Sequence, residues 1–215
     1  MMKIATGILL AAALLVAGAG PTRGEPLPAG IVLQAFGGAP LNFPTTLTIS
    51  QQGEPDIDHR ASWETRPFEQ PLYWALRLRW QRERDGFEFQ LIHHKMYLKN
   101  NPATVEHFEV THGFNILTAG YMRRSRPFHW RAGAGVTLPN TFATVRGELS
   151  DVHDYAVAGP AFLVGGGSEL ALSRRFFLAA EAQFIAAWGT VDVARGEARV
   201  ASLAVHVLFG AGFVF

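Results

Sequence analysis

The stretch SLAVHVLFGAGFVF, residues 202–215, is the feature that most limits how this chain can fold. Read in steps of two, it separates into two faces. One face is uniformly apolar and mostly bulky: Leu203, Val205, Val207, Phe209, Ala211, Phe213 and Phe215. The other is small or mildly polar: Ser202, Ala204, His206, Leu208, Gly210, Gly212 and Val214. Alternation of this kind predicts a β-strand between hydrocarbon and a packed interior, as in a transmembrane β-barrel.

The start of the chain resembles a secretory signal. Lys3 precedes the apolar run IATGILLAAALLVAGAG, and Ala17, Gly18 and Ala19 form a small-x-small cleavage site. We therefore expect a signal peptide over residues 1–19, a Pro- and Gly-rich linker over 20–30, and a single barrel domain over 31–215. The alternative is an uncleaved membrane anchor, because the run approaches the length that spans a bilayer.

Eight apolar segments of strand length follow the linker, and an even number suits a closed antiparallel barrel. They are Ile31–Gly38, Pro71–Trp80, Gly86–Met96, Phe108–Met122, Pro127–Thr137, Tyr155–Leu172, Phe176–Trp188 and Val200–Phe215. The sequence predicts an all-β fold, an eight-stranded antiparallel transmembrane up-and-down β-barrel of the size of OmpA or OmpX. The segment TTLTISQ is either a further strand within the first long loop or the first spanning strand.

The connections alternate between short and long. Residues 81–85, 123–126 and 173–175 form short polar turns, whereas 39–70, 97–107, 138–154 and 189–199 form long loops. Outer-membrane barrels have short periplasmic turns and long extracellular loops, so the pattern favours the outer membrane. The terminal Phe215 resembles the C-terminal aromatic residue that the barrel assembly machinery recognises.

The second face of several strands is charged or polar. It includes Arg77, Arg79, Glu88, Gln90, Arg131, Glu181, Gln183 and His206. A charge facing lipid costs about 2–4 kcal/mol at the midplane, so these residues are expected inside, filling the narrow barrel as a plug. A secreted β-sandwich or lipocalin-like barrel is the alternative, but it would place its charges outside. Trp74, Trp80, Trp130 and Trp188 near strand ends indicate an interfacial aromatic girdle.

Composition excludes several classes of function. The chain has no cysteine, which excludes disulfides, thiolate metal sites and thiol nucleophiles. Without Lys3 the chain carries 18 basic and 18 acidic residues, so it has no basic footprint for nucleic acid. The expected partners are outer-membrane lipids and lipopolysaccharide, and the expected state is a monomer.

Four of the eight histidines flank one predicted loop: His93, His94, His107 and His112. Imidazoles near carboxylates can hold a divalent metal or perform acid/base chemistry. Their spacing matches no zinc signature. Rim histidines and acids also bind lipopolysaccharide head groups and their bridging cations, and the spacing leaves both interpretations open.

Five strings in order, TLTISQ, SWETRPFEQPLYWALRLRW, GFEFQLIHHKMYL, FEVTHGFNILTAGYMRR and GAGVTLPN, resemble the bacterial outer-membrane β-barrel family that includes lipid A oxidase. The likeness covers residues 46–160. Members are implicated in oxidising the proximal glucosamine of lipid A to an aminogluconate with molecular oxygen and a divalent cation. Two positions depart from the family pattern, Thr65 where glycine is usual and Asn140 where histidine is usual.

The resemblance implies a candidate site at the end of the strands. Glu64, His93, His112 and Glu109 would be catalytic, and His93, His112 and Glu64 would hold the divalent cation. Arg77, Lys95, Asn115 and Tyr97 would bind the substrate, with Lys95 and Arg77 on lipid A phosphates. The hypothesis is a lipid A-modifying oxidoreductase; the alternative is a non-catalytic barrel that binds lipopolysaccharide or has an adhesive or structural role. A deacylase is less favoured, because no His-x-Ser pairing occurs.

Overall fold

The computed structural model describes residues 27–110, 113–125, 127–152 and 155–215. The signal peptide and most of the linker predicted above lie outside these residues. No helix within them is long and apolar enough to cross a membrane. Eight antiparallel strands form a barrel: β1 (Gly30–Phe43), β5 (Trp74–Gln81), β6 (Asp85–His93), β9 (Phe114–Ser125), β10 (Phe128–Pro139), β13 (Gly159–Ala171), β14 (Phe176–Val193) and β15 (Gly196–Val214).

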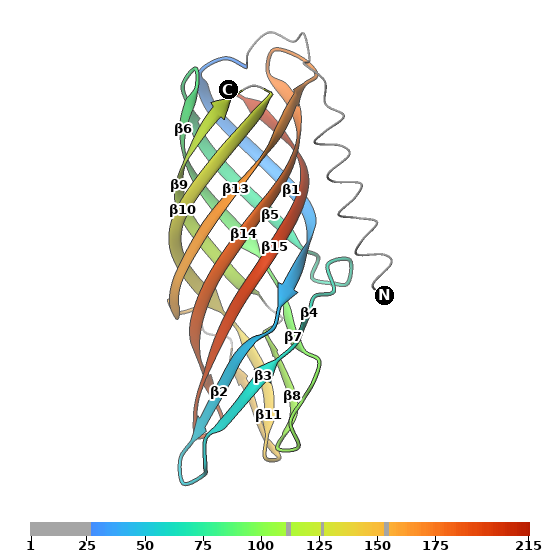
Figure 1. Cartoon of the computed structure of the whole chain (residues 1–215), viewed down its shortest axis with the longest axis vertical. Helices are drawn as coiled ribbons and strands as arrows, with labels where there is room; N and C mark the ends of the chain where they lie inside the picture. Colours follow the sequence, from blue (N-terminus) through green and yellow to red (C-terminus); the bar gives the residue numbers. More distant parts are fainter. Residues whose placement is uncertain (1–26, 111–112, 126, 153–154) are drawn as a thin grey trace.

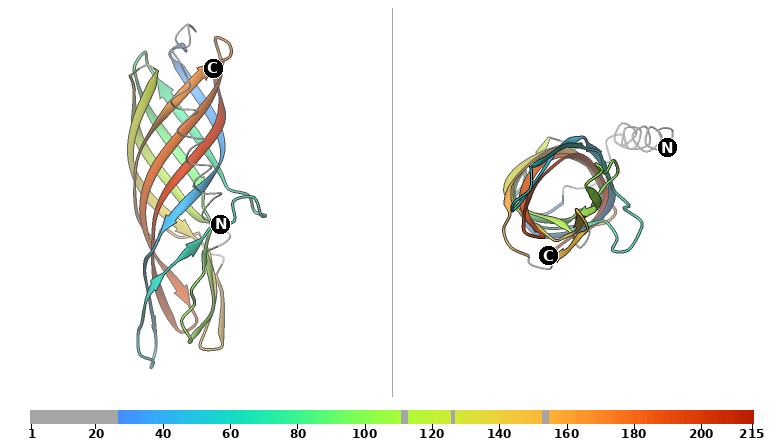
Figure 2. Two further views of the ribbon diagram at one scale, coloured as in Figure 1. Left: turned by 45° about the vertical axis from the view of Figure 1, so that its right-hand side comes forward. Right: turned by 90° about the horizontal axis from the view of Figure 1, so that it is seen from below.

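The sheet closes on itself. Its strands follow the order β1-β5-β6-β9-β10-β13-β14-β15, and β15 pairs back to β1 (Figures 1 and 2). The closing ladder runs over 12 pairs, from Val32 opposite Val214 to Phe43 opposite Leu203. The Phe215 amide continues it by donating to the Ile31 carbonyl at 2.9 Å. Because the barrel closes, none of its eight strands keeps an unpaired edge. A backbone surrounded by hydrocarbon requires this, since its N–H and C=O groups find no other partner there. The predicted eight-stranded antiparallel barrel is confirmed.

The two faces of the wall are oriented as predicted. Leu78, Phe89 and Phe184 point outward and are 49%, 62% and 41% exposed, whereas Arg77 and Glu181 are buried inside. An apolar belt therefore surrounds the barrel, as a transmembrane barrel needs. Its large side chains include Leu33, Leu76, Leu78, Trp80, Phe87, Phe89, Leu117, Trp130, Phe162, Val164, Leu178, Phe184, Trp188, Phe209 and Phe213.

The barrel interior holds an ionic cluster made of Arg77, Arg131, Glu88, Glu181, Gln90 and Gln183. Arg77 donates from both terminal nitrogens to the two oxygens of Glu181, each at 2.7 Å. Arg131 donates to Glu181 at 2.8 Å and also contacts Glu88. A buried charge is tolerated when it is paired and hydrogen-bonded, and these pairs join strands β5, β6, β10 and β14. The side chains fill the barrel at this level, as a plug would.

Three of the predicted long loops fold into hairpins that continue beyond the barrel. Their strands are β2 (Thr45–Gln51), β3 (Ile57–Ala61), β4 (Trp63–Glu64), β7 (Met96–Leu98), β8 (Val105–Val110), β11 (Thr141–Val145) and β12 (Glu148–Val152). We call this part the extension (Figure 1). The segment TTLTISQ is β2, which pairs with β3 and with the first residues of β15, Gly196 to Arg199. The first of the two alternatives for this segment therefore holds.

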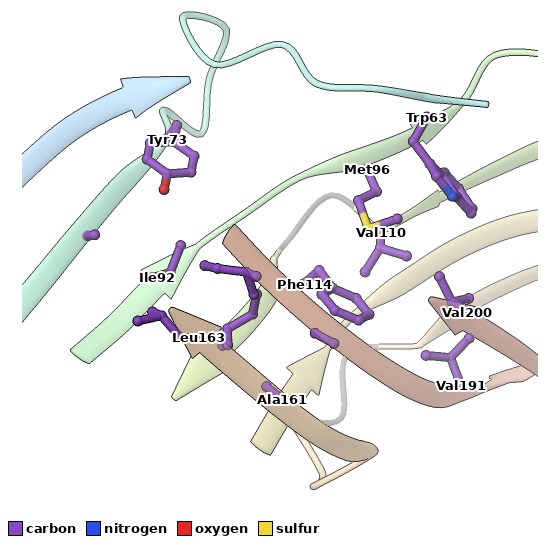
Figure 3. Packing of buried hydrophobic residues seen from close by; sticks show 14 of the residues in the cluster. Trp63, Tyr73, Ile92, Met96, Val110, Phe114, Ala161, Leu163, Val191 and Val200 are labelled. Carbon is purple, nitrogen blue, oxygen red and sulfur yellow. The ribbon is translucent and has the colours of Figure 1, made fainter. Parts of the chain in front are cut away.

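The extension has an apolar core, which belongs to the same cluster of buried hydrophobic side chains as Ile116 and Leu163 of the barrel. Trp63, Met96, Val110, Val191 and Val200 converge there from five strands (Figure 3). The Trp63 ring packs against Phe108 at a centroid distance of 6.2 Å. Burial of such side chains stabilises each by about 1.5–3 kcal/mol, which explains why these segments form strands.

Several predicted boundaries are wrong. The strand predicted over Gly86–Met96 ends at His93 as β6, and the strand predicted from Tyr155 begins at Gly159 as β13. Residues 189–199 are not a long loop, because β14 and β15 continue to a tight hairpin in which Val193 faces Gly196. Alternation persists there, and the apolar residues pack into the extension core. The predicted strand Phe108–Met122 is instead two strands, β8 and β9, and Gly113 between them has a φ of 114° that favours glycine.

We predict that Glu181→Gln lowers the free energy of unfolding by about 3–5 kcal/mol, because Arg77 and Arg131 then lack a buried counter-charge. Urea unfolding of the refolded protein in detergent, followed by gel mobility with and without heating, measures this. Glu197→Gln is the control, since Glu197 pairs with Arg199 at the exposed rim and its loss should cost less than about 1 kcal/mol. Equal unfolding midpoints for the two variants would contradict the assigned role of the cluster.

Candidate functional site

The end of β6 carries the first part of the candidate site on the outside of the barrel. His93 continues the outward face of Phe87 and Phe89. Its ring stacks on Trp74 of the neighbouring strand, with centroids 5.5 Å apart and planes 9° apart. Its Nδ1 lies 2.9 Å from Oδ1 of Asn115 on β9. An amide oxygen only accepts, so this contact places the ring proton on Nδ1. His93 and Asn115 are thus brought together at the edge of the apolar belt.

A second part lies on the outer face of the extension. Strands β4, β7 and β8 are neighbours, and their register places Glu64 opposite Tyr97 and Tyr97 opposite Glu109. The alternating residues Trp63 and Met96 point into the apolar core (Figure 3). Three residues that are far apart in the sequence therefore form one row on the outward face.

Two cations lie against this row. The guanidinium of Arg66 is 4.5 Å from the centroid of the Tyr97 ring, and Lys95 Nζ is 5.7 Å from it. Lys95 Nζ also donates to the Glu69 carbonyl at 2.8 Å. Burial lowers the pKa of Lys95, and the Glu69 carboxylate opposes this shift. Cation–π attraction to the Tyr97 ring holds these two positive charges at the wall of the extension.

We call this set the outer-wall site: Glu64, Arg66, His93, Lys95, Tyr97, Glu109 and Asn115. His93 on β6 and Tyr97 on β7 take the outward parity of their strands, whereas Lys95 lies in the link between the two strands and its side chain is fully buried. The site lies directly beyond the apolar belt, where β6 and β9 leave the barrel. The carboxylates of Glu64 and Glu109 and the phenol of Tyr97 are partly exposed on this face, whereas the His93 imidazole and the Lys95 amine are buried.

Arg77 lies apart from the other predicted substrate-binding residues. It points into the barrel, where Gln90 and Glu181 accept its hydrogen bonds at 2.6–2.8 Å. The wall of the barrel separates it from Lys95, because position 77 has the opposite parity to the outward Trp74 and Leu78 on the same strand. Arg66, which the sequence analysis did not single out, supplies the second cation on the outer wall. The sequence feature that could have pointed to Arg66 is its position within the string SWETRPFEQP, which is part of the family resemblance.

His112 lies outside the described residues, so the predicted metal trio of His93, His112 and Glu64 is only partly visible. Within the described ranges, no group of three or more His, Cys, Asp or Glu side chains is placed to hold a metal ion. The divalent cation stays a prediction.

A second group of polar side chains lies inside the barrel near the same level. The hydroxyl of Tyr73 and Nδ1 of His206 are 2.8 Å apart, and the His206 and His94 rings have centroids 5.0 Å apart. All three side chains are buried. His206 stood out in the sequence as the polar residue of the last strand, but its partners come from distant segments that no local pattern connects.

No family model matches the sequence. No curated protein matches it either. Among solved structures, the outer membrane protein OprG from Pseudomonas aeruginosa aligns at 12% identity over 87% of this chain and 97% of its own, with a TM-score of 0.49. The outer membrane protein AlkL, solved in lipid bilayers, aligns at 14% identity over 91% and 95%, with a TM-score of 0.48. Ail, the attachment invasion locus protein of Yersinia pestis, aligns at 12% identity over 87% and 99%, with a TM-score of 0.43.

The structure itself defines the class of protein. A closed ring of eight antiparallel strands, an apolar outer wall and paired charges inside are together the fold of an outer-membrane β-barrel protein.

We predict that Tyr97 titrates above pH 10. Burial raises the pKa of Tyr97 from its usual 10.0, and the Glu109 carboxylate adds to this, against the opposing charge of Arg66. The ultraviolet difference between the wild type and Tyr97→Phe, recorded during alkaline titration in detergent, isolates this phenol. N-acetyltyrosinamide in the same detergent is the reference, and a midpoint at or below that of the reference would show that Tyr97 is not enclosed as described.

Proposed function

We propose that the protein is exported and inserted in the outer membrane, with its short turns in the periplasm and its extension outside the cell. The apolar belt and the paired interior charges support this location, because they match hydrocarbon outside and a sealed interior. The expected signal peptide provides the export route. Heat-modifiable migration of the protein from outer-membrane fractions tests the location, and recovery in the soluble fraction would refute it.

We propose that the outer-wall site binds the head group of lipid A. The observation that carries this proposal is the outward row of Glu64, Tyr97 and Glu109, with Arg66 over the Tyr97 ring, at the level where the apolar belt ends. A head group of the outer leaflet lies at that level, with its acyl chains against the belt. Arg66, whose side chain is partly exposed, suits its phosphates, and Asn115 suits sugar hydroxyls. Lys95 is buried and donates to the Glu69 carbonyl, so it supports the loop that carries Arg66.

The loop before β5 adds to this surface. Phe68 is 80% exposed and Leu72 is 46% exposed, next to Arg66. Apolar side chains beside a cation are typical of residues at a membrane interface. In the proposed orientation this loop contacts the outer leaflet beside the bound head group.

A second candidate function is oxidation of the proximal glucosamine of lipid A. The assembly of His93, Glu64 and Glu109 on one outward surface favours it, because the family resemblance implies these residues as catalytic. The hemiacetal carbon would lose two electrons and two protons to molecular oxygen, giving a lactone and hydrogen peroxide, and water would open the lactone to the aminogluconate. A divalent cation would supply Lewis-acid or redox chemistry, and a carboxylate would accept a proton.

Lipid A mass spectrometry tests the enzymatic proposal. In a strain that lacks the gene, expression should add the mass of one oxygen atom to lipid A. His93→Gln and Glu109→Gln should each reduce the modified fraction at least about tenfold, as loss of an acid/base or ligand group does. His59→Gln on β3 is the matched control and should keep the modification. Unchanged lipid A from correctly inserted wild-type protein would discard the oxidation.

Binding is tested separately with purified protein and lipid A. Arg66→Gln should weaken binding at least about tenfold if its guanidinium contacts phosphate. Lys99→Gln, at an exposed turn of the extension, should have no effect. Binding without oxidation would favour the non-catalytic alternative.

A further inference from the structure

The charged residues of the barrel are segregated by height. The interior of the described structure holds three of each sign: Arg77, Arg79 and Arg131 with Glu88, Glu169 and Glu181. The extension and its adjoining loops hold seven basic residues: Arg60, Arg66, Lys95, Lys99, Arg146, Arg195 and Arg199. They also hold eleven acidic ones: Glu54, Asp56, Asp58, Glu64, Glu69, Glu106, Glu109, Glu148, Asp151, Asp192 and Glu197. That end of the molecule is therefore acidic.

The opposite end, which we call the short-turn rim, is strongly basic. Its described residues include six arginines: Arg82, Arg84, Arg123, Arg124, Arg174 and Arg175. Among the described residues, the acids Glu83 and Asp85 lie in the same turns, and Glu169 of β13 pairs with Arg124 from inside the barrel. All three short turns contribute arginine, so the positive charge surrounds the rim rather than collecting on one strand (Figure 1).

Part of this charge is directed at the bilayer and not at the barrel interior. The guanidinium of Arg82 lies 5.3 Å from the centroid of the Trp80 ring, and Trp80 is 58% exposed on the outer wall. Trp130 and Phe213 are outward aromatic residues of the same end. Aromatic residues of this kind mark the depth of the lipid head groups, so Arg82 is placed at phosphate depth.

The arginines of the short-turn rim differ in how closely an acidic side chain approaches them. Arg124 points inward and pairs with Glu169 at 2.6 Å. Arg123 lies 3.7 Å from Asp85. Arg82, Arg84 and Arg175 are exposed at the turns. An exposed arginine near a membrane surface attracts anionic lipid by about 1 kcal/mol.

We propose that the short-turn rim is a binding surface for anionic phospholipids, with Arg82, Arg84 and Arg175 contacting their phosphate groups. This goes beyond lipid A recognition, which concerns the opposite leaflet, and it requires only that the barrel spans a bilayer. A guanidinium presents paired N–H donors that match phosphate geometry. The net negative head group of phosphatidylglycerol complements the excess positive charge, whereas zwitterionic phosphatidylcholine does not. The acidic extension repels the same lipid, so selection occurs at one rim.

Electron paramagnetic resonance of spin-labelled lipids tests the proposal with the full mature chain refolded in phosphatidylcholine vesicles. We expect spin-labelled phosphatidylglycerol to associate with the barrel about threefold more strongly than spin-labelled phosphatidylcholine at low salt. The variant Arg82→Gln, Arg84→Gln, Arg175→Gln should lower this ratio to about one. In about 0.5 M salt the wild-type ratio should also fall, because the exposed charges are then screened.

The matched control removes the same number of charges from the acidic end, as Arg60→Gln, Lys99→Gln, Arg199→Gln, and should keep the wild-type ratio. Heat-modifiable migration confirms that each variant is folded. A wild-type ratio of one, or an equal loss of selectivity in both triple variants, would overturn the proposal. No lipid A is present in these vesicles, so the result is independent of the function proposed for the outer-wall site.

Discussion

The pairing of β1 with β15 is the constraint on which the rest of the structure depends. Hydrocarbon offers no partner to a backbone amide or carbonyl, so the sheet must satisfy these groups by closing. Closure fixes an inside and an outside, and alternation along each strand then decides the position of every side chain. Arg77 and Glu181 must meet in the interior because the belt residues occupy the exterior. The outward positions of His93 on β6 and Tyr97 on β7, beyond the belt, follow from the same alternation.

The sequence was sufficient to predict the architecture. A strand that faces lipid on one side and a packed interior on the other must alternate apolar and polar residues. The eight spanning segments, the outward Leu78 and Phe184 and the inward Arg77 all follow from this alternation. The sequence was insufficient for the extension, where turns and hairpins in water obey no such requirement. Residues 189–199 contain Asp, Arg and Gly and therefore resemble a loop, yet their alternating valines and alanines complete a buried core.

The candidate site was predictable in part for the same reason. His93 and Tyr97 take the outward parity of β6 and β7, whereas Lys95 between them lies outside both strands and is buried. The neighbours of His93 and Tyr97, namely Glu64, Glu109 and Asn115, come from other strands whose register no local pattern reveals. The sequence placed Arg77 both in the interior and among substrate ligands, and the structure shows it enclosed by Gln90 and Glu181. Arg66 became visible as a wall cation only through its contact with the Tyr97 ring.

The β14–β15 ladder has 18 consecutive pairs and passes without interruption from the polar barrel interior into the apolar core of the extension. The barrel and the extension therefore share one continuous two-stranded ladder, with no hinge between them. A sideways force on the extension would therefore tilt the whole molecule rather than bend the hairpin.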